Sequence, residues 1–177
     1  MGLRSKLDGL RRFFIIRSSQ DKRVKYLRGL GVKIGERCTV DTLAFSTEPY
    51  LVELGDYVGI AGGTEFIAHD AGIRCFREDF PEDDIFGTIK IGNNVFIGSN
   101  CTILPNTVIG DNCIVGAGSV IRGTFPENSV IIGNPAKVAY DMKVQKFMYR
   151  KSPGRIPTAR MSDPEKKPHV IEHFKNL

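Results

Sequence analysis

His69 stands out among the residues that could do chemistry because of its place in the chain. It lies near the start of a stretch of about twenty residues, from Ile67 to Thr88, that interrupts an otherwise periodic sequence. A connection of this length inside a repetitive fold is uncommon unless it has a function. Imidazole exchanges protons near neutral pH, so a histidine at this place could serve acid–base chemistry, although a lone histidine is more often structural.

The other two histidines form a pattern that resembles a zinc motif. His169, Glu172 and His173 fit the H-x-x-E-H spacing. No third ligand follows them and Pro168 immediately precedes them, so we interpret the match as chance and expect no metal. The four cysteines contain no C-x-x-C pair, which leaves a zinc or redox motif without support.

A repeat of six residues must position His69. An aliphatic side chain returns at every sixth position in the middle of the chain: Ile91, Ile97, Ile103, Ile109, Val115 and Ile121. Neither strand alternation nor an amphipathic helix has this period. Hexapeptide repeats are typical of solenoids in which each repeat is a short strand plus a turn. We therefore predict a mainly β fold, a parallel β-helix over residues 32–135, with an excursion loop at 68–88.

Helices are predicted on both sides of the β-helix. The first has apolar residues at helical spacing, namely Leu3, Leu7, Leu10 and Phe14, and a second is expected at about 19–30. Residues 1–31 then form a basic helical cap, because the terminal coil of a solenoid needs cover. Residues 136–177 are predicted to hold a helix that starts at Pro135, a favoured first position, and an extended or disordered tail.

Charge is distributed unevenly along the chain. The net charge is +8 for residues 1–37, −8 for residues 38–137 and +5 for residues 138–177. Solvated helix faces and a solvated tail explain the basic ends most simply, and contact with an anionic membrane, phosphate or partner surface is the alternative. For the N-terminal helix, the alternative to a capping role is that it lies on a membrane surface. The basic ends lack interleaved aromatic residues and any recognised nucleic-acid motif, so no nucleic-acid partner is expected.

The sequence predicts a cytoplasmic protein, with membrane association as the alternative. Three cysteines fall four places after a repeat aliphatic residue, where a small buried residue is needed: Cys38, Cys101 and Cys113. Cys75 lies outside the repeat, and unpaired cysteines suit a reducing compartment. No run approaches the roughly 18 apolar residues of a membrane span, and the N-terminus is a poor signal peptide.

The central run of the chain resembles a known family. It reads IGNNVFIGSNCTILPNTVIGDNCIVGAGSVI over residues 91–121 and is followed by GNPAK at 133–137. This run is similar to the bacterial hexapeptide-repeat acyltransferases, especially the galactoside, maltose and polysaccharide O-acetyltransferase branch. The resemblance implies a left-handed parallel β-helix of triangular cross-section with about eighteen residues per coil. It also implies a homotrimer with active sites between subunits.

The resemblance assigns roles near the acceptor. It makes His69 the general base, since acyl transfer from a thioester to a hydroxyl needs a base within hydrogen-bond reach of the attacking oxygen. Asp70 would orient the imidazole or bind an acceptor hydroxyl. Phe96 corresponds to an aromatic residue that borders the acceptor in sugar acetyltransferases. Arg74 and Arg77, in the excursion, suit a larger glycan or a lipid-linked sugar.

The resemblance also places the acyl donor, acetyl-CoA, along a groove beside the C-terminal coils. Six residues match donor-binding positions or lie near them: Gly98, Ser99, Gly116, Ala117, Arg122 and Lys137. The first four would offer backbone groups to the pantetheine arm or to the oxyanion. The two basic residues would bind the phosphate end of the donor, and no metal is expected.

These features predict an acyl-CoA-dependent O-acyltransferase that acetylates a sugar hydroxyl of a polysaccharide, a glycan or a precursor. Residues 42–47 lack the Asn that assists the acceptor site in the galactoside and maltose enzymes, which favours an acceptor larger than a free sugar. Two alternatives stay open. One is an N-acetyltransferase of an amino-sugar nucleotide, and the other is a non-catalytic hexapeptide-repeat binding protein.

Overall fold

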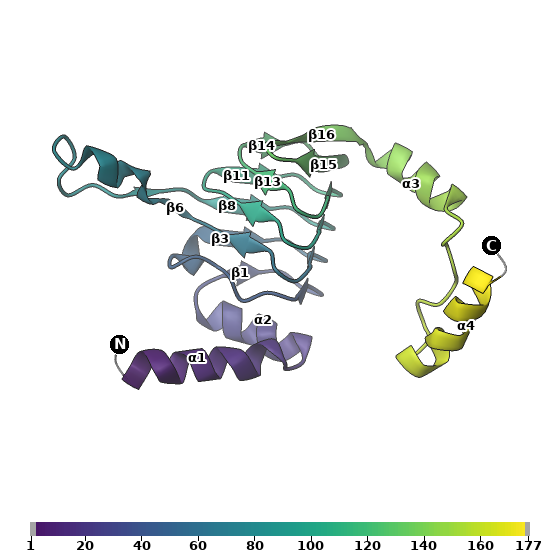
Figure 1. Cartoon of the computed structure of the whole chain (residues 1–177). Coiled ribbons are helices and arrows are strands. Elements are labelled where there is room, and N and C mark those ends of the chain that lie inside the picture. Colours follow the sequence, from purple (N-terminus) through teal and green to yellow (C-terminus); the bar gives the residue numbers. More distant parts are fainter. Residues whose placement is uncertain (1–2, 176–177) are drawn as a thin grey trace. The chain divides into compact units, whose positions relative to one another are not determined.

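The computed structural model describes residues 3–175 and the side chains of residues 9–175 (Figure 1). The chain forms two compact units, Met1–Met142 and Lys143–Leu177. Its helices are α1 (Leu3–Ile16), α2 (Gln20–Gly29), the 3-10 turns η1 (Pro49–Leu51) and η2 (Ala71–Phe76), α3 (Met142–Lys151) and α4 (Asp163–Lys175). Among the residues described, no helix is long and apolar enough to cross a membrane.

The strands are short, as a six-residue repeat requires. They are β1 (Lys33–Ile34), β2 (Thr39–Val40), β3 (Val52–Leu54), β4 (Gly59–Ile60), β5 (Glu65–Phe66), β6 (His69–Asp70), β7 (Ile85–Phe86), β8 (Ile89–Ile91), β9 (Phe96–Ile97), β10 (Thr102–Ile103), β11 (Thr107–Ile109), β12 (Ile114–Val115), β13 (Val120–Ile121), β14 (Thr124–Phe125), β15 (Ser129–Gly133) and β16 (Ala136–Asp141).

Three sheets form the walls of a parallel β-helix. Their strand orders are β1-β3-β8-β11-β14, β13-β10-β5 and β16-β15-β12-β9-β4-β2, and only the β15–β16 pair in them is antiparallel among the strands described. Stacked residues in the regular coils are 18 positions apart, as Asn93 and Asp111 are. The offset is 20 in the first coil, between Glu36 and Asp56, and 37 across the excursion, between Asp56 and Asn93. The β-helix prediction is confirmed.

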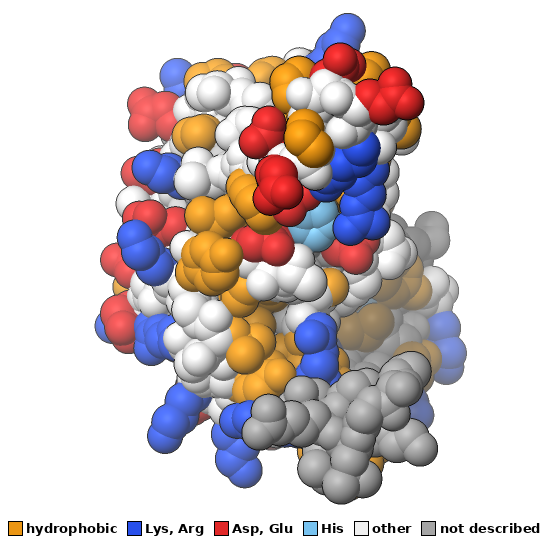
Figure 2. All heavy atoms as spheres, turned by 90° about the vertical axis from the view of Figure 1, so that its left-hand side faces the viewer, with side chains coloured by type: hydrophobic (Ala, Val, Ile, Leu, Met, Phe, Trp, Pro, Cys, Tyr) orange, Lys and Arg blue, Asp and Glu red, His pale blue; other side chains and the backbone are white. Residues whose placement is uncertain are grey.

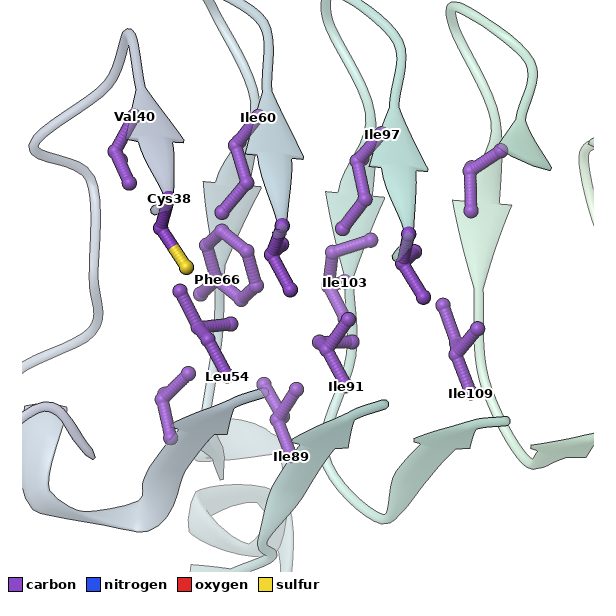
Figure 3. Packing of buried hydrophobic residues seen from close by; sticks show 14 of the residues in the cluster. Cys38, Val40, Leu54, Ile60, Phe66, Ile89, Ile91, Ile97, Ile103 and Ile109 are labelled. Atoms are coloured by element: carbon purple, nitrogen blue, oxygen red, sulfur yellow. The ribbon is translucent and has the colours of Figure 1, made fainter. Parts of the chain in front are cut away.

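The core is built from the predicted aliphatic positions. All six of them are buried, with at most 3% of each residue exposed. Stacked positions come into register between coils, so Ile60 lies beside Ile97 and Phe66 beside Ile103 (Figure 3). Cys38, Cys101 and Cys113 are buried and unpaired, which confirms their packing role, and Cys75 is exposed. Apolar burial of this kind is the main stabilising term of the solenoid.

Helix α2 covers the first coil. Val24 and Leu27 are buried in the same cluster as the coil residues. The side-chain amide of Gln20 donates to Asp41 over 2.8 Å and accepts from the backbone N–H of Val40 over 2.8 Å. The Arg28 guanidinium donates to the Ile34 carbonyl over 2.8 Å. These contacts supply partners to backbone groups that the end of a solenoid leaves open.

Helix α1 differs from the sequence-based expectation. Its apolar stripe was expected to face the coil, but Leu10 and Phe14 are 55% and 62% exposed. The side chains of Leu3 and Leu7 lie outside the described residues. Among the described side chains of α1, Ile15 and Ile16, at its C-terminal end, pack against the core. Because α2 already covers the first coil, less apolar coil surface is left for α1 to pack against.

The predicted helix start at Pro135 is wrong. Residues 136–141 form β16, which returns antiparallel to β15, and the helix begins at Met142 rather than at Pro135. Gly133, with φ of 114°, allows the reversal, because this region favours glycine. Pairing with an open sheet edge outweighs the local preference of proline for a helix start.

The prediction of an extended or disordered tail is wrong for residues 163–175, which form α4. The segment Ser162-Asp-Pro-Glu165 has the sequence of a capping box, and the Glu165 carboxylate accepts from the Ser162 hydroxyl over 2.6 Å and from the Ser162 N–H over 2.8 Å. These bonds lower the pKa of the Glu165 carboxyl. The sequence contained this start signal, and the high content of proline and charge obscured it.

Candidate active site

His69 is paired with a carboxylate from the preceding coil. Its Nδ1 lies 2.8 Å from Oε2 of Glu48. Two hydroxyls also donate to this carboxylate, Ser46 to Oε2 over 2.7 Å and Thr47 to Oε1 over 2.5 Å. The Thr47 bond is the largest cause, and with the His69 and Ser46 bonds it lowers the pKa of Glu48 to about 2. Glu48 is therefore ionised at neutral pH.

The charge of Glu48 determines the state of the imidazole. A carboxylate can only accept, so Nδ1 of His69 carries a hydrogen and donates it to Glu48. In the neutral ring Nε2 then keeps its lone pair and can take a proton from a bound molecule. The His69 side chain is 38% exposed and that of Glu48 is 14% exposed. The base is thus accessible while the group that orients it is covered.

The depressed pKa of Glu48 predicts a pH dependence of stability. A carboxyl whose pKa is lower in the folded state stabilises the fold above its unfolded pKa, and this contribution disappears as pH falls toward the folded pKa. The stability difference between wild type and Glu48→Gln should therefore be largest at pH 6, on the order of 1–3 kcal/mol, and should shrink between about pH 5 and pH 2. Urea unfolding at several pH values measures it. A difference that does not change with pH would contradict the lowered pKa.

Local geometry explains why Glu48 reaches His69. The first coil contains extra residues at this corner, which gives it the offset of 20. Ser46 adopts φ of 27°, and its N–H donates to the Phe66 carbonyl over 2.8 Å. Its hydroxyl also accepts from the Ala68 N–H over 3.2 Å. The widened corner of one coil is thereby bonded to the chain just before His69 in the next.

Sequence reasoning missed Glu48. The available signal was the loss of the six-residue period at 47–51, which falls one coil before the interruption that starts near His69. Two interruptions at the same corner of consecutive coils must lie next to each other. The aromatic pair at this corner, Phe45 and Phe66, stacks with centroids 4.4 Å apart and keeps the two coils in register.

His69 borders a hollow of about 160 Å³ at the base of the excursion. Glu48, Arg74, Asp84 and Phe86 also line it, so the wall contains both charges and one aromatic face. Figure 2 shows an imidazole exposed on this face of the molecule, bordered by acidic and basic side chains. The hollow can therefore hold a polar molecule with hydroxyl groups next to the ring.

Asp70 lines the hollow beside His69, but its carboxylate is bonded elsewhere than to the imidazole. Its Oδ1 accepts from the Gly72 N–H over 2.9 Å, and its Oδ2 lies 3.7 Å from Nη2 of Arg122. The hydrogen bond expected from Asp70 to the imidazole comes instead from Glu48, because consecutive residues of an extended segment point in opposite directions. Arg122 was predicted to bind the phosphate end of the donor. In this chain it instead lies near Asp70, where the excursion begins.

The two arginines of the excursion differ in their surroundings. Arg74 lines the hollow with His69. Arg77 instead donates to the carbonyls of Phe80 and Asp83 and, over 2.9 Å, to the Asp84 carboxylate. These bonds occupy Arg77 within the excursion, whereas Arg74 lines the hollow beside His69.

The predicted donor residues lie at a different corner. Gly98, Ser99, Gly116 and Ala117 follow β9 and β12, whereas His69 follows β5, beyond the three-stranded sheet β13-β10-β5. One chain therefore does not bring the two groups together. A Cβ on Gly98 would lie 2.6 Å from the Ala117 backbone nitrogen, so close stacking of coils requires glycine there.

Two further predicted residues are exposed on the six-stranded sheet. Phe96 is 51% exposed on β9 and lies beside Gly59 of the neighbouring strand. Lys137 is exposed on β16, opposite Ile132. Neither contributes to the hollow at His69 in the same chain.

The H-x-x-E-H pattern lies on α4 of the C-terminal unit. His169, Glu172 and His173 line a common hollow there. The Nε2 of His173 lies 2.6 Å from the Pro153 carbonyl oxygen, which can only accept, so this nitrogen donates and is not available to a metal. Within residues 3–175, no three His, Cys, Asp or Glu side chains are grouped to hold a metal ion.

Comparison with known proteins identifies the family of the chain. Residues 88–123 match the family model of the bacterial transferase hexapeptide (six repeats). Protein CapG of Staphylococcus aureus is 41% identical over 165 residues, which cover 89% of this chain and 90% of CapG.

Two solved structures are similar in fold. A maltose O-acetyltransferase from Clostridium difficile 630 is 27% identical with a TM-score of 0.50, over 70% of this chain and 76% of that one. A galactoside acetyltransferase in complex with coenzyme A is 23% identical with a TM-score of 0.57, over 82% of this chain and 84% of that one. With the nearly full-length match to CapG, these similarities show that the chain belongs to the bacterial hexapeptide-repeat transferases and is an enzyme of their acyltransferase branch.

Proposed function

We propose that the chain transfers an acetyl group from acetyl-CoA to a sugar hydroxyl, with His69 as the general base. The observation that carries the proposal is the 2.8 Å contact between Nδ1 of His69 and the ionised Glu48, at the edge of a hollow with polar walls. A base oriented by a partly buried carboxylate is the arrangement that removes a proton from a weakly acidic hydroxyl.

The reaction follows from this pair. An acceptor hydroxyl in the hollow gives its proton to Nε2 of His69 while its oxygen attacks the thioester carbonyl. The imidazolium that forms is stabilised by the Glu48 carboxylate, which stays ionised. The C–S bond then breaks, and the proton on Nε2 passes to the departing thiolate. No covalent intermediate on the enzyme is required.

We also propose that the complete site lies between copies of the chain in a homotrimer of left-handed β-helices. The support is the separation of the two groups of residues, since Ser99 and Ala117 lie at one edge of the three-stranded sheet and His69 at the other. In the proposed trimer, a neighbouring copy would bring its own donor corner to His69. The acetyl-CoA would then contact backbone groups of one copy and the base of another.

The acceptor is proposed to be a glycan, a polysaccharide precursor or a lipid-linked sugar. Arg74 and Phe86 support this, because a guanidinium donates to several hydroxyls at once and an aromatic ring offers a flat apolar face to a sugar. Asp84, from the end of the excursion, also lines the hollow and adds an acceptor of hydrogen bonds.

A screen for thiol release tests the proposal. The purified protein is mixed with acetyl-CoA and with free sugars, sugar nucleotides or glycolipids, and the free thiol is followed over time. We expect thiol release with a glycan hydroxyl acceptor and a product ester that mild base cleaves. A product stable to mild base would indicate an amide and an amino-sugar acceptor. No release with any acceptor, together with no binding of acetyl-CoA by calorimetry, would favour a binding protein.

A further inference from the structure

Helix α1 carries an apolar face that the other described residues of its own unit, Met1–Met142, leave exposed. Leu10, Phe13 and Phe14 are 55%, 49% and 62% exposed. Their i, i+3, i+4 spacing puts them on one side of the helix. Ile15 and Ile16, which pack against the core, lie on another side. The outer apolar face of α1, meaning Leu10, Phe13 and Phe14, is thus available to a partner.

One basic side chain lies on this face, and three more line the neighbouring groove between α1 and α2. The guanidinium of Arg17 lies 3.7 Å from the ring centroid of Phe13. A hollow of about 350 Å³ between α1 and α2 is lined by Arg11, Lys22 and Lys25 and by no acidic side chain. We call these four residues the basic border of α1. The outer apolar face and the basic border together fit a partner that is apolar inside and anionic at its surface.

We propose that α1 lies on an anionic lipid surface, with its outer apolar face among the acyl chains and its basic border on the phosphate groups. An amphipathic helix rich in Arg and Lys binds the interface of a bilayer in this way, and anionic lipids add attraction for each nearby cation. The helix has 14 residues, which is too short to cross a bilayer and sufficient to lie in its plane. Contact with the same face of a second copy is less favourable, because it would place the two basic borders next to each other.

The position of α1 links this surface to His69. The Arg12 guanidinium donates to the Leu43 carbonyl over 2.6 Å and fixes the helix to the first coil. A second hollow, of about 350 Å³, is lined by Arg12 and Thr47 and by His69. A membrane under α1 would therefore present a lipid-linked acceptor beside the base, a consequence that rests on the proposed function, whereas membrane binding itself does not.

Co-sedimentation of the full chain with vesicles tests the proposal. The vesicles are phosphatidylcholine alone or with about 30 mol% phosphatidylglycerol. We expect binding to the anionic vesicles, a loss of at least about tenfold in partitioning for Phe13→Asp/Phe14→Asp, and a weaker, less salt-dependent interaction for Lys22→Gln/Lys25→Gln. Equal binding of the wild type and the Phe13→Asp/Phe14→Asp variant, or no binding of the wild type, would overturn the proposal.

Matched controls separate the alternatives. Phe147→Asp/Tyr149→Asp changes two aromatic residues on α3 that are 61% and 55% exposed, and should leave vesicle binding unchanged. Thiol release with a water-soluble acceptor should be the same for Phe13→Asp/Phe14→Asp and wild type, so failure of this proposal is distinguishable from failure of the proposed function. If the Phe13→Asp/Phe14→Asp variant has a smaller mass than the wild type by light scattering, the face is a contact between copies and the lipid proposal is wrong.

Discussion

Replacement of His69 by alanine should lower kcat/KM for acetyl transfer by about 10²–10⁴, the usual contribution of a general base. The loss should appear in kcat, because the imidazole takes the proton only as the acceptor oxygen attacks. The KM for acetyl-CoA should change little, since the predicted donor residues lie at another corner of the coil. Initial rates of thiol release at several concentrations of each substrate separate the two parameters.

Two neighbouring carboxylates give this prediction a control. Glu48→Gln keeps the shape of the side chain but removes the charge that holds the Nδ1 hydrogen, so kcat should fall clearly, to between the wild type and His69→Ala. Asp70→Asn changes a group bonded to Gly72 and near Arg122, and should cost less than Glu48→Gln. Turnover of His69→Ala near the wild-type value would reject the assignment of the base.

The β-helix and its core could be predicted from the sequence because both depend on a local period. Each coil offers the same environment, so a residue type that recurs every six positions must recur in the same place. The burial of Ile97, Ile103 and Cys101 follows from that rule alone. The same reasoning marks His69 as unusual, since it lies where the period stops.

The remaining features depend on contacts between segments that the period does not describe. Glu48 meets His69 only because the first coil is two residues longer than a regular one, a difference that becomes informative once both interruptions are placed at the same corner. The amphipathic period of α1 predicts an apolar face and cannot say what lies against it. Pro135 favours a helix start locally, but residues 136–141 form a strand because they pair with the open edge of β15.

Replacement of Ile103 by aspartate should unfold the β-helix. The side chain is fully buried in β10, at the centre of its sheet, with Phe66 and Ile121 in the same position of the coils on either side. The change removes a buried aliphatic group, worth roughly 1.5–3 kcal/mol, and adds a carboxylate without a partner. A loss above about 4 kcal/mol is therefore expected, comparable to the stability of many domains. Circular dichroism and urea unfolding measure it.

Milder changes in the same strand show whether the effect comes from burial. Ile103→Val removes one methylene and should cost about 0.5–1.5 kcal/mol. Thr102→Asp puts the same carboxylate on the neighbouring, partly exposed position and should be tolerated. Because the Ile67 N–H donates to the Ile103 carbonyl over 2.8 Å, β10 also anchors the chain just before His69. Ile103→Val should therefore keep full activity, whereas a folded Ile103→Asp protein would mean that this position does not face the core.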